Sequence, residues 1–228
     1  MSPVSTPYPP VRSFRPRRRA LSPARTGMYE RLLERWALTV DGAPLDFDAL
    51  FGTATGASPK VVLDIGFGGG EGLVEMAAQR ADEALIGIDV HTPGVAKVLE
   101  AIETNDWQHV RVVEGDVLEL LPRIPPSSLT GIRLFFPDPW PKQKQKHRRL
   151  ARPDVVAALV ERLRIGGTLH LATDIADYAA QAIGVCDGEP RLRGGVVPRP
   201  DWRPQTRFER RGLDAGRAAT DLIYERIL

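Results

Sequence analysis

Short apolar runs alternate with stretches of helical periodicity along most of the chain. Five runs are predicted strands, at residues 61–65, 84–90, 110–114, 132–136 and 168–172. Helices are predicted between them near residues 71–80, 94–104 and 153–164, with Gly166 and Gly167 closing the last one. Strands that are apolar on both faces and are separated by helices require right-handed crossovers. The pattern therefore predicts an α/β fold with a doubly wound, mostly parallel sheet.

The two ends of the pattern differ from its middle. Near the N-terminus, an amphipathic helix that packs on the sheet is predicted from apolar residues at helical spacing: Tyr29, Leu32, Leu33 and Trp36. It should end before the turn at Asp41-Gly42. Residues 1–25 hold six prolines and little to bury, so they are predicted to be a disordered tail. After a helix near 175–184 and an arginine-rich stretch, residues 221–228 should close the sheet as an antiparallel strand.

Composition narrows the class of protein. With 228 residues and 43% apolar content, the chain can bury one substantial core, so residues 26–228 are predicted to form one domain. The single cysteine, Cys186, excludes an internal disulfide, and the four histidines offer no zinc-like spacing, so no metal is expected. No apolar run approaches the roughly 18 residues of a membrane span, and no signal peptide is expected. We expect a cytoplasmic protein without membrane contact; monomer and homodimer both stay open.

Positive charge is concentrated in two segments, although the net charge is only +2. Residues 12–35 hold eight arginines against Glu30 and Glu34, and residues 142–152 hold six cations and no acid. This distribution favours a polyanion bound at a defined place. The alternative for either segment is an ordinary solvated face.

Acidic residues follow three of the predicted strands at the edge where doubly wound sheets bind ligands. Asp64 precedes a glycine-rich turn in which Gly66 and Gly68 let the backbone approach a ligand closely. This turn is not a dinucleotide fingerprint, because Glu71 stands where the third glycine belongs and would repel a pyrophosphate. Asp89 could accept hydrogen bonds from two ribose hydroxyls, and Asp116 could hold an adenine amino group.

The predicted site contains acidic residues and has no phosphate-binding turn, which indicates an adenosine-containing cofactor with a positive charge. S-adenosylmethionine fits that description. For each acid taken singly, the alternative is a helix N-cap or first-turn residue. A fourth acid, Asp138, lies in FFPDPWPK at the end of the fourth predicted strand, directly before the basic run at residues 142–152.

Six motifs together resemble those of the tRNA (guanine-N7-)-methyltransferase family, within the class I S-adenosylmethionine-dependent methyltransferases. In chain order they are VLDIGFGGGEG, GIDVHTPGV, VEGDV, LFFPDPWPK, LHLATD and RPQTRFERRGL. The resemblance runs from about residue 28 to the C-terminus. It implies a Rossmann-like fold and transfer of a methyl group from S-adenosylmethionine to N7 of a guanine in the variable loop of tRNA.

The resemblance also implies roles for individual residues. Asp64, Asp89 and Asp116 fall at cofactor positions, and Asp138 falls where the family contacts the cofactor and acts catalytically. The substrate positions are Lys142, Asp174, Thr206, Arg207, Phe208 and Glu209. Asp64 and Asp89 stand where the family often has Glu, and because each carboxylate is one methylene shorter, a water bridge could replace a direct contact.

The chemistry implied by the resemblance explains the mixture of charges. Guanine N7 has a lone pair and attacks without losing a proton, so Asp138 is expected to stabilise charge on the purine and not to act as a base. Cations are expected to bind the RNA phosphates around it: Lys144, Lys146, Arg148 and Arg149. Thr206–Glu209 is expected in a loop that reads the guanine edge. Trp140 could stack on the base or form a surface lid, and Phe136 is expected to pack in the core.

Two other functions stay open at this point. Asp138-Pro139-Trp140-Pro141 loosely resembles the D-P-P-Y motif of methyltransferases that act on adenine N6 or cytosine N4, although the order of proline and aromatic residues differs. The second alternative is a non-catalytic RNA-binding protein with a vestigial pocket.

Overall fold

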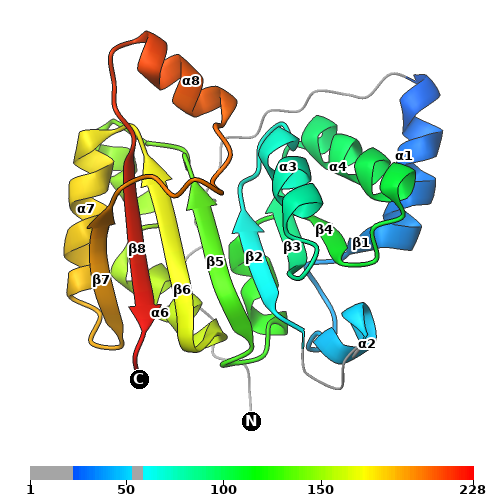
Figure 1. The fold of residues 1–228 in the computed structure, drawn as a ribbon, viewed down its shortest axis with the longest axis horizontal. Coiled ribbons are helices and arrows are strands. Elements are labelled where there is room, and N and C mark those ends of the chain that lie inside the picture. Colours follow the sequence, from blue (N-terminus) through cyan, green and yellow to red (C-terminus); the bar gives the residue numbers. More distant parts are fainter. Residues whose placement is uncertain (1–22, 53–58) are drawn as a thin grey trace.

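A single mixed sheet forms the centre of the computed structural model, which describes residues 23–52 and 59–228. In these residues eight strands pair in the order β1-β4-β3-β2-β5-β6-β8-β7 (Figure 1). The strands are β1 (Ala37–Leu38), β2 (Val61–Ile65), β3 (Ala84–Asp89), β4 (Val110–Glu114), β5 (Leu129–Phe135), β6 (Leu163–Thr173), β7 (Leu192–Val197) and β8 (Thr220–Arg226). Every neighbouring pair from β1 to β6 is parallel, whereas β8 is antiparallel to both β6 and β7.

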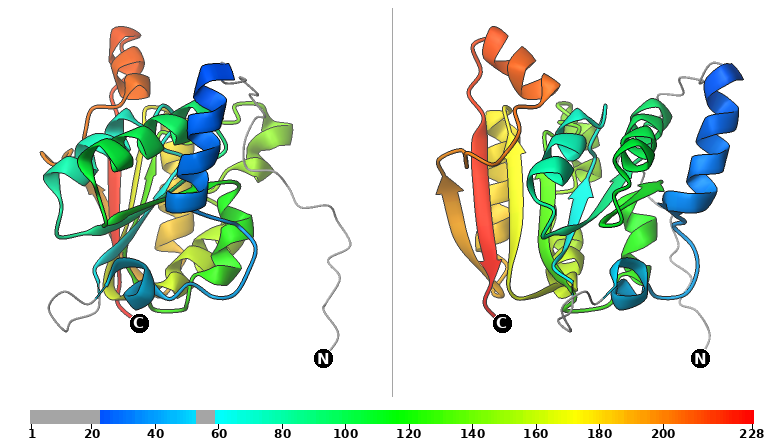
Figure 2. Two further views of the ribbon diagram at one scale, coloured as in Figure 1. Left: turned by 90° about the vertical axis from the view of Figure 1, so that its right-hand side faces the viewer. Right: turned by 45° about the vertical axis from the view of Figure 1, so that its right-hand side comes forward.

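Helices cover both faces of the sheet (Figures 1 and 2). One layer contains α1 (Pro23–Trp36), α3 (Glu71–Gln79) and α4 (Thr92–Asn105). The other contains α5 (Val117–Leu120), α6 (Pro153–Arg162) and α7 (Ala176–Asp187). The remaining helices are α2 (Phe47–Phe51), α8 (Arg207–Asp214) and the 3-10 turns η1 (Leu121–Arg123) and η2 (Gln143–Arg148).

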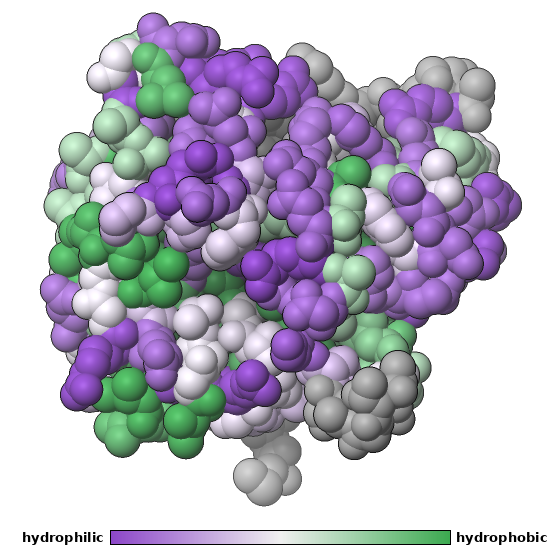
Figure 3. Space-filling view, viewed as in Figure 1, coloured by the Kyte–Doolittle hydropathy of each residue, from purple (hydrophilic) through white to green (hydrophobic). Residues whose placement is uncertain are grey.

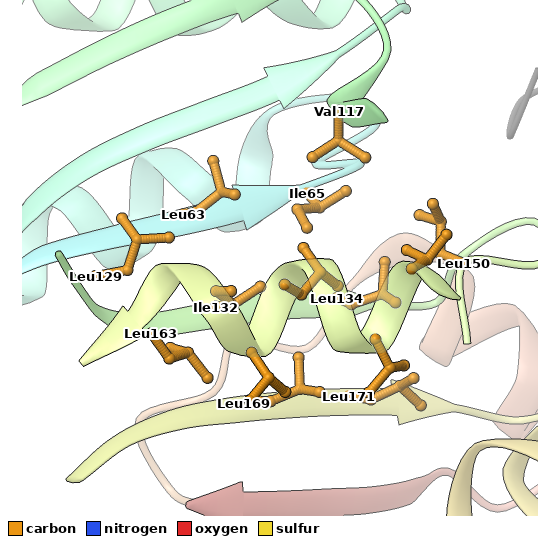
Figure 4. Packing of buried hydrophobic residues seen from close by; sticks show 14 of the residues in the cluster. Leu63, Ile65, Val117, Leu129, Ile132, Leu134, Leu150, Leu163, Leu169 and Leu171 are labelled. Atoms are coloured by element: carbon orange, nitrogen blue, oxygen red, sulfur yellow. The ribbon is translucent and has the colours of Figure 1, made fainter. Parts of the chain in front are cut away.

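Alternating side chains of the central strands serve the two layers. In β2, Leu63 and Ile65 pack into the cluster under α6, while Val62 belongs to the cluster under α3 and α4. Figure 4 shows Leu63, Ile132, Leu134, Leu169 and Leu171 interlocking between neighbouring strands beneath α6. Strands with apolar residues on both faces are therefore buried on both faces, as the sequence pattern indicates.

The predicted α/β fold and the antiparallel closing strand are confirmed, but the end of one helix was wrong and one strand was not predicted. The helix predicted at 153–164 ends at Arg162, and Gly166-Gly167 lies inside β6, where the pairing with β5 shifts register. The closing strand β8 is not the edge strand, because β7 pairs on its outer side. The arginine-rich stretch, to which no element was assigned, contains β7.

The N-terminal helix packs on α4 and β4, as expected for a lead-in helix. Of the tail predicted at residues 1–25, residues 1–22 lie outside the described part of the chain, and residues 23–25 are the first turn of α1.

The fold brings the ends of β2, β3, β4 and β5 to one edge of the sheet, because these strands are parallel. We call this side the carboxyl edge. Helix α8 lies beyond it, above β6 and β8, in both views (Figures 1 and 2). The residues that follow the central strands are thus the ones that can meet around a ligand.

Truncating a central core side chain should lower the stability of the fold. Ile132 in β5 is fully buried, so Ile132→Ala should reduce the unfolding free energy by about 2–5 kcal/mol through lost burial and a residual cavity. Ile165→Ala removes the same atoms from a side chain that is 68% exposed, and should change it by less than about 0.5 kcal/mol. Urea denaturation followed by circular dichroism measures both, and equal losses would contradict this description of the core.

Candidate active site

The turn after β2 has a backbone that only glycine adopts readily. Gly66, Gly68 and Gly70 have φ values of 76°, 61° and 85°, all in the left-handed region. Helix α3 begins at the next residue, Glu71, with Gly70 as its N-cap. The turn therefore places bare backbone at the carboxyl edge, where a ligand can approach closely.

Side chains from the end of β3 hold this turn in place. The N–H of Gly68 donates to Oδ2 of Asp89 at 2.6 Å, and the N–H of His91 donates to Oδ1 of the same carboxylate at 2.7 Å. The ring Nδ1 of His91 lies 3.1 Å from the carbonyl oxygen of Gly68. Burial raises the pKa of Asp89, although these backbone hydrogen bonds act in the opposite direction. Both carboxylate oxygens keep lone pairs that a ligand hydroxyl could use.

Gly94 is a site residue to which the sequence analysis gave no role. A Cβ on Gly94 would lie 1.8 Å from the carbonyl oxygen of Gly68, so helix α4 can reach the glycine-rich turn only because this residue has no side chain. The motif GIDVHTPGV contained the signal. A glycine in the first turn of a helix, where other residues are better helix formers, indicates close approach of another backbone.

Asp64 is a buried acid with an unused oxygen. It is 3% exposed, and its Oδ2 has no hydrogen-bond partner among the described residues. Burial raises its pKa to about 7; the Arg133 guanidinium opposes this shift and the Asp89 carboxylate adds to it. A buried acceptor without a donor is costly, and a cationic or N–H donating ligand would satisfy it. The residues present therefore fit S-adenosylmethionine, which carries an ammonium and ribose hydroxyls.

Asp116 follows β4 and caps helix α5. Its Oδ1 accepts a hydrogen bond from the N–H of Leu118 at 3.1 Å, and the residue is 7% exposed. The N-cap alternative is thus confirmed for this acid. A contact with an adenine amino group stays a prediction, since a carboxylate has acceptor capacity beyond one cap.

Asp138 lies in a tightly turned segment after β5. Phe136 and Trp140 both have positive φ, at 52° and 42°. Trp140 is only 2% exposed, so the predictions that it stacks on a base or forms a surface lid are wrong for this structure. Phe136 packs against the cluster under α3 and α4, as expected. Asp138 itself is partly exposed between these two aromatic residues, at the carboxyl edge beside the turn after β2.

The basic run divides into exposed and internal cations. Lys142 and Lys144 are exposed, whereas Lys146 pairs with Asp177 at 2.7 Å. Arg148 lies over the Trp140 ring at 5.0 Å. Arg149 is 1% exposed, so its predicted contact with an RNA phosphate does not fit this structure. The number of cations in the sequence overstates the number available to a polyanion.

The TRFE motif, Thr206 to Glu209, is helical and not a loop, which corrects the prediction. Thr206 is the N-cap of α8 and accepts the N–H of Glu209 at 3.1 Å. Glu209 is 4% exposed and forms two hydrogen bonds with Arg203, at 2.7 and 2.8 Å. Its carboxylate is therefore occupied and does not read a guanine edge in this structure.

Arg203 connects the TRFE motif to the sheet. It is fully buried and also pairs with Asp221 of β8, whose other contact is the ring of His170 in β6. Arg203 is the first residue of RPQTRFERRGL but was given no role, because one arginine among several in a loop carries no signal of burial.

The exposed residues of the motif reach the cofactor side. Phe208 Cε2 lies 3.5 Å from the position that a Cβ on Gly68 would take, and Arg207 lies 3.5 Å from Glu71. Asp174, after β6, pairs with Arg217 at 2.8 Å. Figure 3 shows that the surface around α8 is mostly hydrophilic, whereas apolar residues gather on the β7 side of this face. The structure thus brings Arg207 and Phe208 beside the glycine-rich turn.

Comparison with known proteins gives consistent results. The Methyltransf_4 family of methyltransferases matches residues 58–222. The chain is 41% identical over 223 residues to the tRNA (guanine-N(7)-)-methyltransferase of Streptomyces avermitilis, covering 95% of this chain and 76% of that one. It is 43% identical over 222 residues to the protein of the same name from Xanthomonas campestris pv. campestris, covering 95% and 84%.

One solved structure shares the fold at low identity. It is a mutant of the 16S rRNA (adenine(1408)-N(1))-methyltransferase from Catenulisporales acidiphilia with its cosubstrate SAM, at a TM-score of 0.57 and 13% identity, covering 82% of this chain and 93% of that one. This likeness concerns the fold alone.

Adding a methyl group at Gly94 should disturb the glycine-rich turn. We expect Gly94→Ala to weaken binding of S-adenosylmethionine at least about tenfold, because the turn at Gly68 must move to relieve the clash. Gly184→Ala in α7 is the matched control, since a Cβ there meets nothing within 4 Å and alanine favours a helix. Calorimetric titration of both variants checks this, and unchanged affinity in Gly94→Ala would remove the turn from the cofactor site.

The raised pKa of Asp64 should make cofactor binding depend on pH. A cationic ligand favours the ionised carboxylate, so affinity for S-adenosylmethionine should rise as the pH increases from about 5.5 to 7, by up to about tenfold per unit. The ligand's own amino group stays charged in this range. Asp64→Asn should bind weakly and show no such rise. Titrations at several pH values measure this, and a parent affinity that is flat below pH 7 would refute the assignment.

Proposed function

The chain belongs to the tRNA (guanine-N7-)-methyltransferase family, and we propose that its Asp138 stabilises the charge that develops on a guanine of the tRNA variable loop during methyl transfer to N7. The observation that carries this proposal is the convergence of Asp64, Asp89 and Asp138 at the ends of three adjacent parallel strands. A cofactor held by the first two lies next to a substrate held at the third.

The cofactor is S-adenosylmethionine, which supplies an electrophilic methyl group on a sulfonium. We assign its binding to six residues at the carboxyl edge: Asp64, Gly66, Gly68, Asp89, Asp116 and Asp138. Asp64 offers an unused buried oxygen to the ammonium. Asp89 offers lone pairs to the ribose hydroxyls, and the glycines allow close backbone approach.

Asp138 needs to do no proton transfer. Neutral guanine N7 attacks with its own lone pair, and the positive charge then moves from sulfur to the purine. A carboxylate fixed near the purine lowers the energy of this charge in the transition state. The turn between Phe136 and Trp140 gives Asp138 a fixed backbone position, which is the alignment that such catalysis requires.

The RNA approaches the carboxyl edge from the side of η2. N7 of a base-paired guanine lies in a deep, narrow groove of A-form RNA, so the target base must be presented outside the helix. Lys142 and Lys144 are exposed beside Asp138 and suit the flanking phosphates. Lys146 and Arg148 can join them only by exchanging their contacts with Asp177 and Trp140. Asp174, Thr206, Arg207 and Phe208 would contact the nucleotide from the α8 side, and Glu209 would hold α8 in place.

We place the reaction in the cytoplasm, in a domain formed by residues 26–228. Among the helices of the described residues, none is long and apolar enough to cross a bilayer. The same residues contain no group of three or more His, Cys, Asp and Glu that could hold a metal ion.

Neither an amino-directed activity nor a non-catalytic role is favoured by the relatives, which carry the name of a guanine-N7 enzyme.

Removing the charge of Asp138 should slow methyl transfer while binding survives. Asp138→Asn keeps the shape, so we expect a single-turnover rate about 100-fold lower at saturating tRNA and cofactor. The parent rate at saturation should be nearly flat from about pH 6 to 9, because no proton is removed. Labelled S-adenosylmethionine, followed by chain cleavage at N7-methylguanine, measures the product.

Asp82→Asn is the matched control, because it removes a carboxylate before β3, at the opposite edge of the sheet. It should leave the rate unchanged. A parent rate that rises tenfold per pH unit and is abolished in Asp138→Asn would instead make Asp138 a general base and support an amino-group acceptor.

A further inference from the structure

We propose that Arg149 is a positioning residue for Asp138 and not a phosphate-binding residue. Arg149 is 1% exposed, although it lies in the most basic segment of the described chain. Its guanidinium is 4.8 Å from the centre of the Tyr178 ring in α7. A side chain so enclosed cannot reach an RNA backbone without leaving its site.

Every arm of the guanidinium is used inside the protein. Nε donates to the carbonyl oxygen of Pro139 at 2.8 Å, Nη1 donates to Oε1 of Gln181 at 2.8 Å, and Nη2 donates to Oδ2 of Asp177 at 2.7 Å. Asp177 and Gln181 are one turn apart on α7. Arg149 thus links a rigid helix to the residue that directly follows Asp138.

The segment it holds needs such support. Trp140 has a φ of 42°, a strained conformation for a tryptophan that persists only when the surroundings fix it. The carbonyl of Pro139 belongs to the peptide unit between Pro139 and Trp140, so the hydrogen bond from Arg149 acts on the strained unit itself. Arg148 lies over the Trp140 ring from the same run, at 5.0 Å. Both arginines therefore fix the turn that presents Asp138.

Arginine is required for this geometry. Its planar fork supplies donors in three directions, which match one backbone carbonyl, one amide and one carboxylate. Lysine would keep the charge but could not span these three acceptors. Lys146 shares Asp177 with Arg149 and is more exposed, so an RNA phosphate could take Lys146 away while Arg149 keeps its carboxylate.

This inference rests on the proposed function of Asp138, and its test separates the two. We expect Arg149→Lys to lower the single-turnover rate at saturating tRNA and cofactor about 10- to 100-fold, because a displacement of about 1 Å at the reacting groups has such an effect. The affinity for tRNA and its dependence on salt should stay as in the parent. Arg226→Lys is the matched control, since Arg226 also binds backbone carbonyls but at the opposite edge of the sheet, and its rate should be unchanged.

Lys144→Ala shows the change in salt dependence that is expected when a residue that binds an RNA phosphate is lost. Loss of one phosphate contact should flatten the slope of log affinity against log salt by about 0.7–0.9. Arg149→Gln removes the charge, and if it shows this flattening with an unchanged saturated rate, Arg149 binds phosphate and the inference is overturned. A normal rate in Arg149→Lys together with a slow Asp138→Asn overturns the positioning role and leaves the proposed function intact. A normal rate in Asp138→Asn defeats the proposed function itself.

Asp177→Asn keeps the experiment decisive if Arg149→Lys does not fold. It weakens the anchor of Arg149 but leaves the arginine in place, so the saturated rate should fall by a smaller factor. A thermal melt of each variant confirms that the folded protein is compared. An unchanged rate in folded Asp177→Asn would then count against the inference.

Discussion

Crowding of carboxylates at one edge of a parallel sheet is the constraint on which this site depends. Asp64 and Asp89 end adjacent strands, and each disfavours the charge of the other. Burial is the largest cause of the raised pKa of Asp64; the nearby Arg133 guanidinium opposes it, and it also forms a buried pair with Glu83 at 2.6 Å. In the free protein the negative charge of these carboxylates is therefore destabilised, and a cationic ligand stabilises it. The fold thus favours a cationic cofactor over one that carries phosphate.

At the carboxyl edge, the backbone and the side chains have different roles. The glycine-rich turn supplies close approach but has no side chains with which to hold itself. Asp89, His91 and Gly94 hold it from the neighbouring strand and helix, through two hydrogen bonds and one close backbone contact. Asp138 is held in a comparable way, by side chains that come later in the chain. In both cases the backbone that faces the ligand is fixed by side chains from other elements, and Asp89 has the additional role of binding the cofactor.

Sequence reasoning succeeded where a residue's role follows from its immediate neighbours. The central strands, the acids at their ends and the glycine turn are local patterns, and the predicted positions of Asp64, Asp89 and Asp138 at one edge follow from parallel pairing. It failed where burial depends on distant partners. Arg149 looks solvated in a run of cations, and only Asp177 and Gln181, about 30 residues on, make it internal. Glu209 is engaged by Arg203, which is itself held by Asp221 of β8, and β7 was missed because exposed arginine and glycine residues hide an edge strand.

Strand β8 lies between β6 and β7 in the sheet and runs antiparallel to both of them. Strand β7 runs to the carboxyl edge, where β8 begins, and the connection between them, which holds Arg203 and helix α8, lies at this edge (Figure 1). Strand β8 then runs away from that edge, and the C-terminus emerges on the opposite side of the molecule (Figure 1). A fusion or affinity tag at Leu228 consequently extends away from the surface that must accept a large folded RNA, which makes this end the natural attachment point for immobilising the protein.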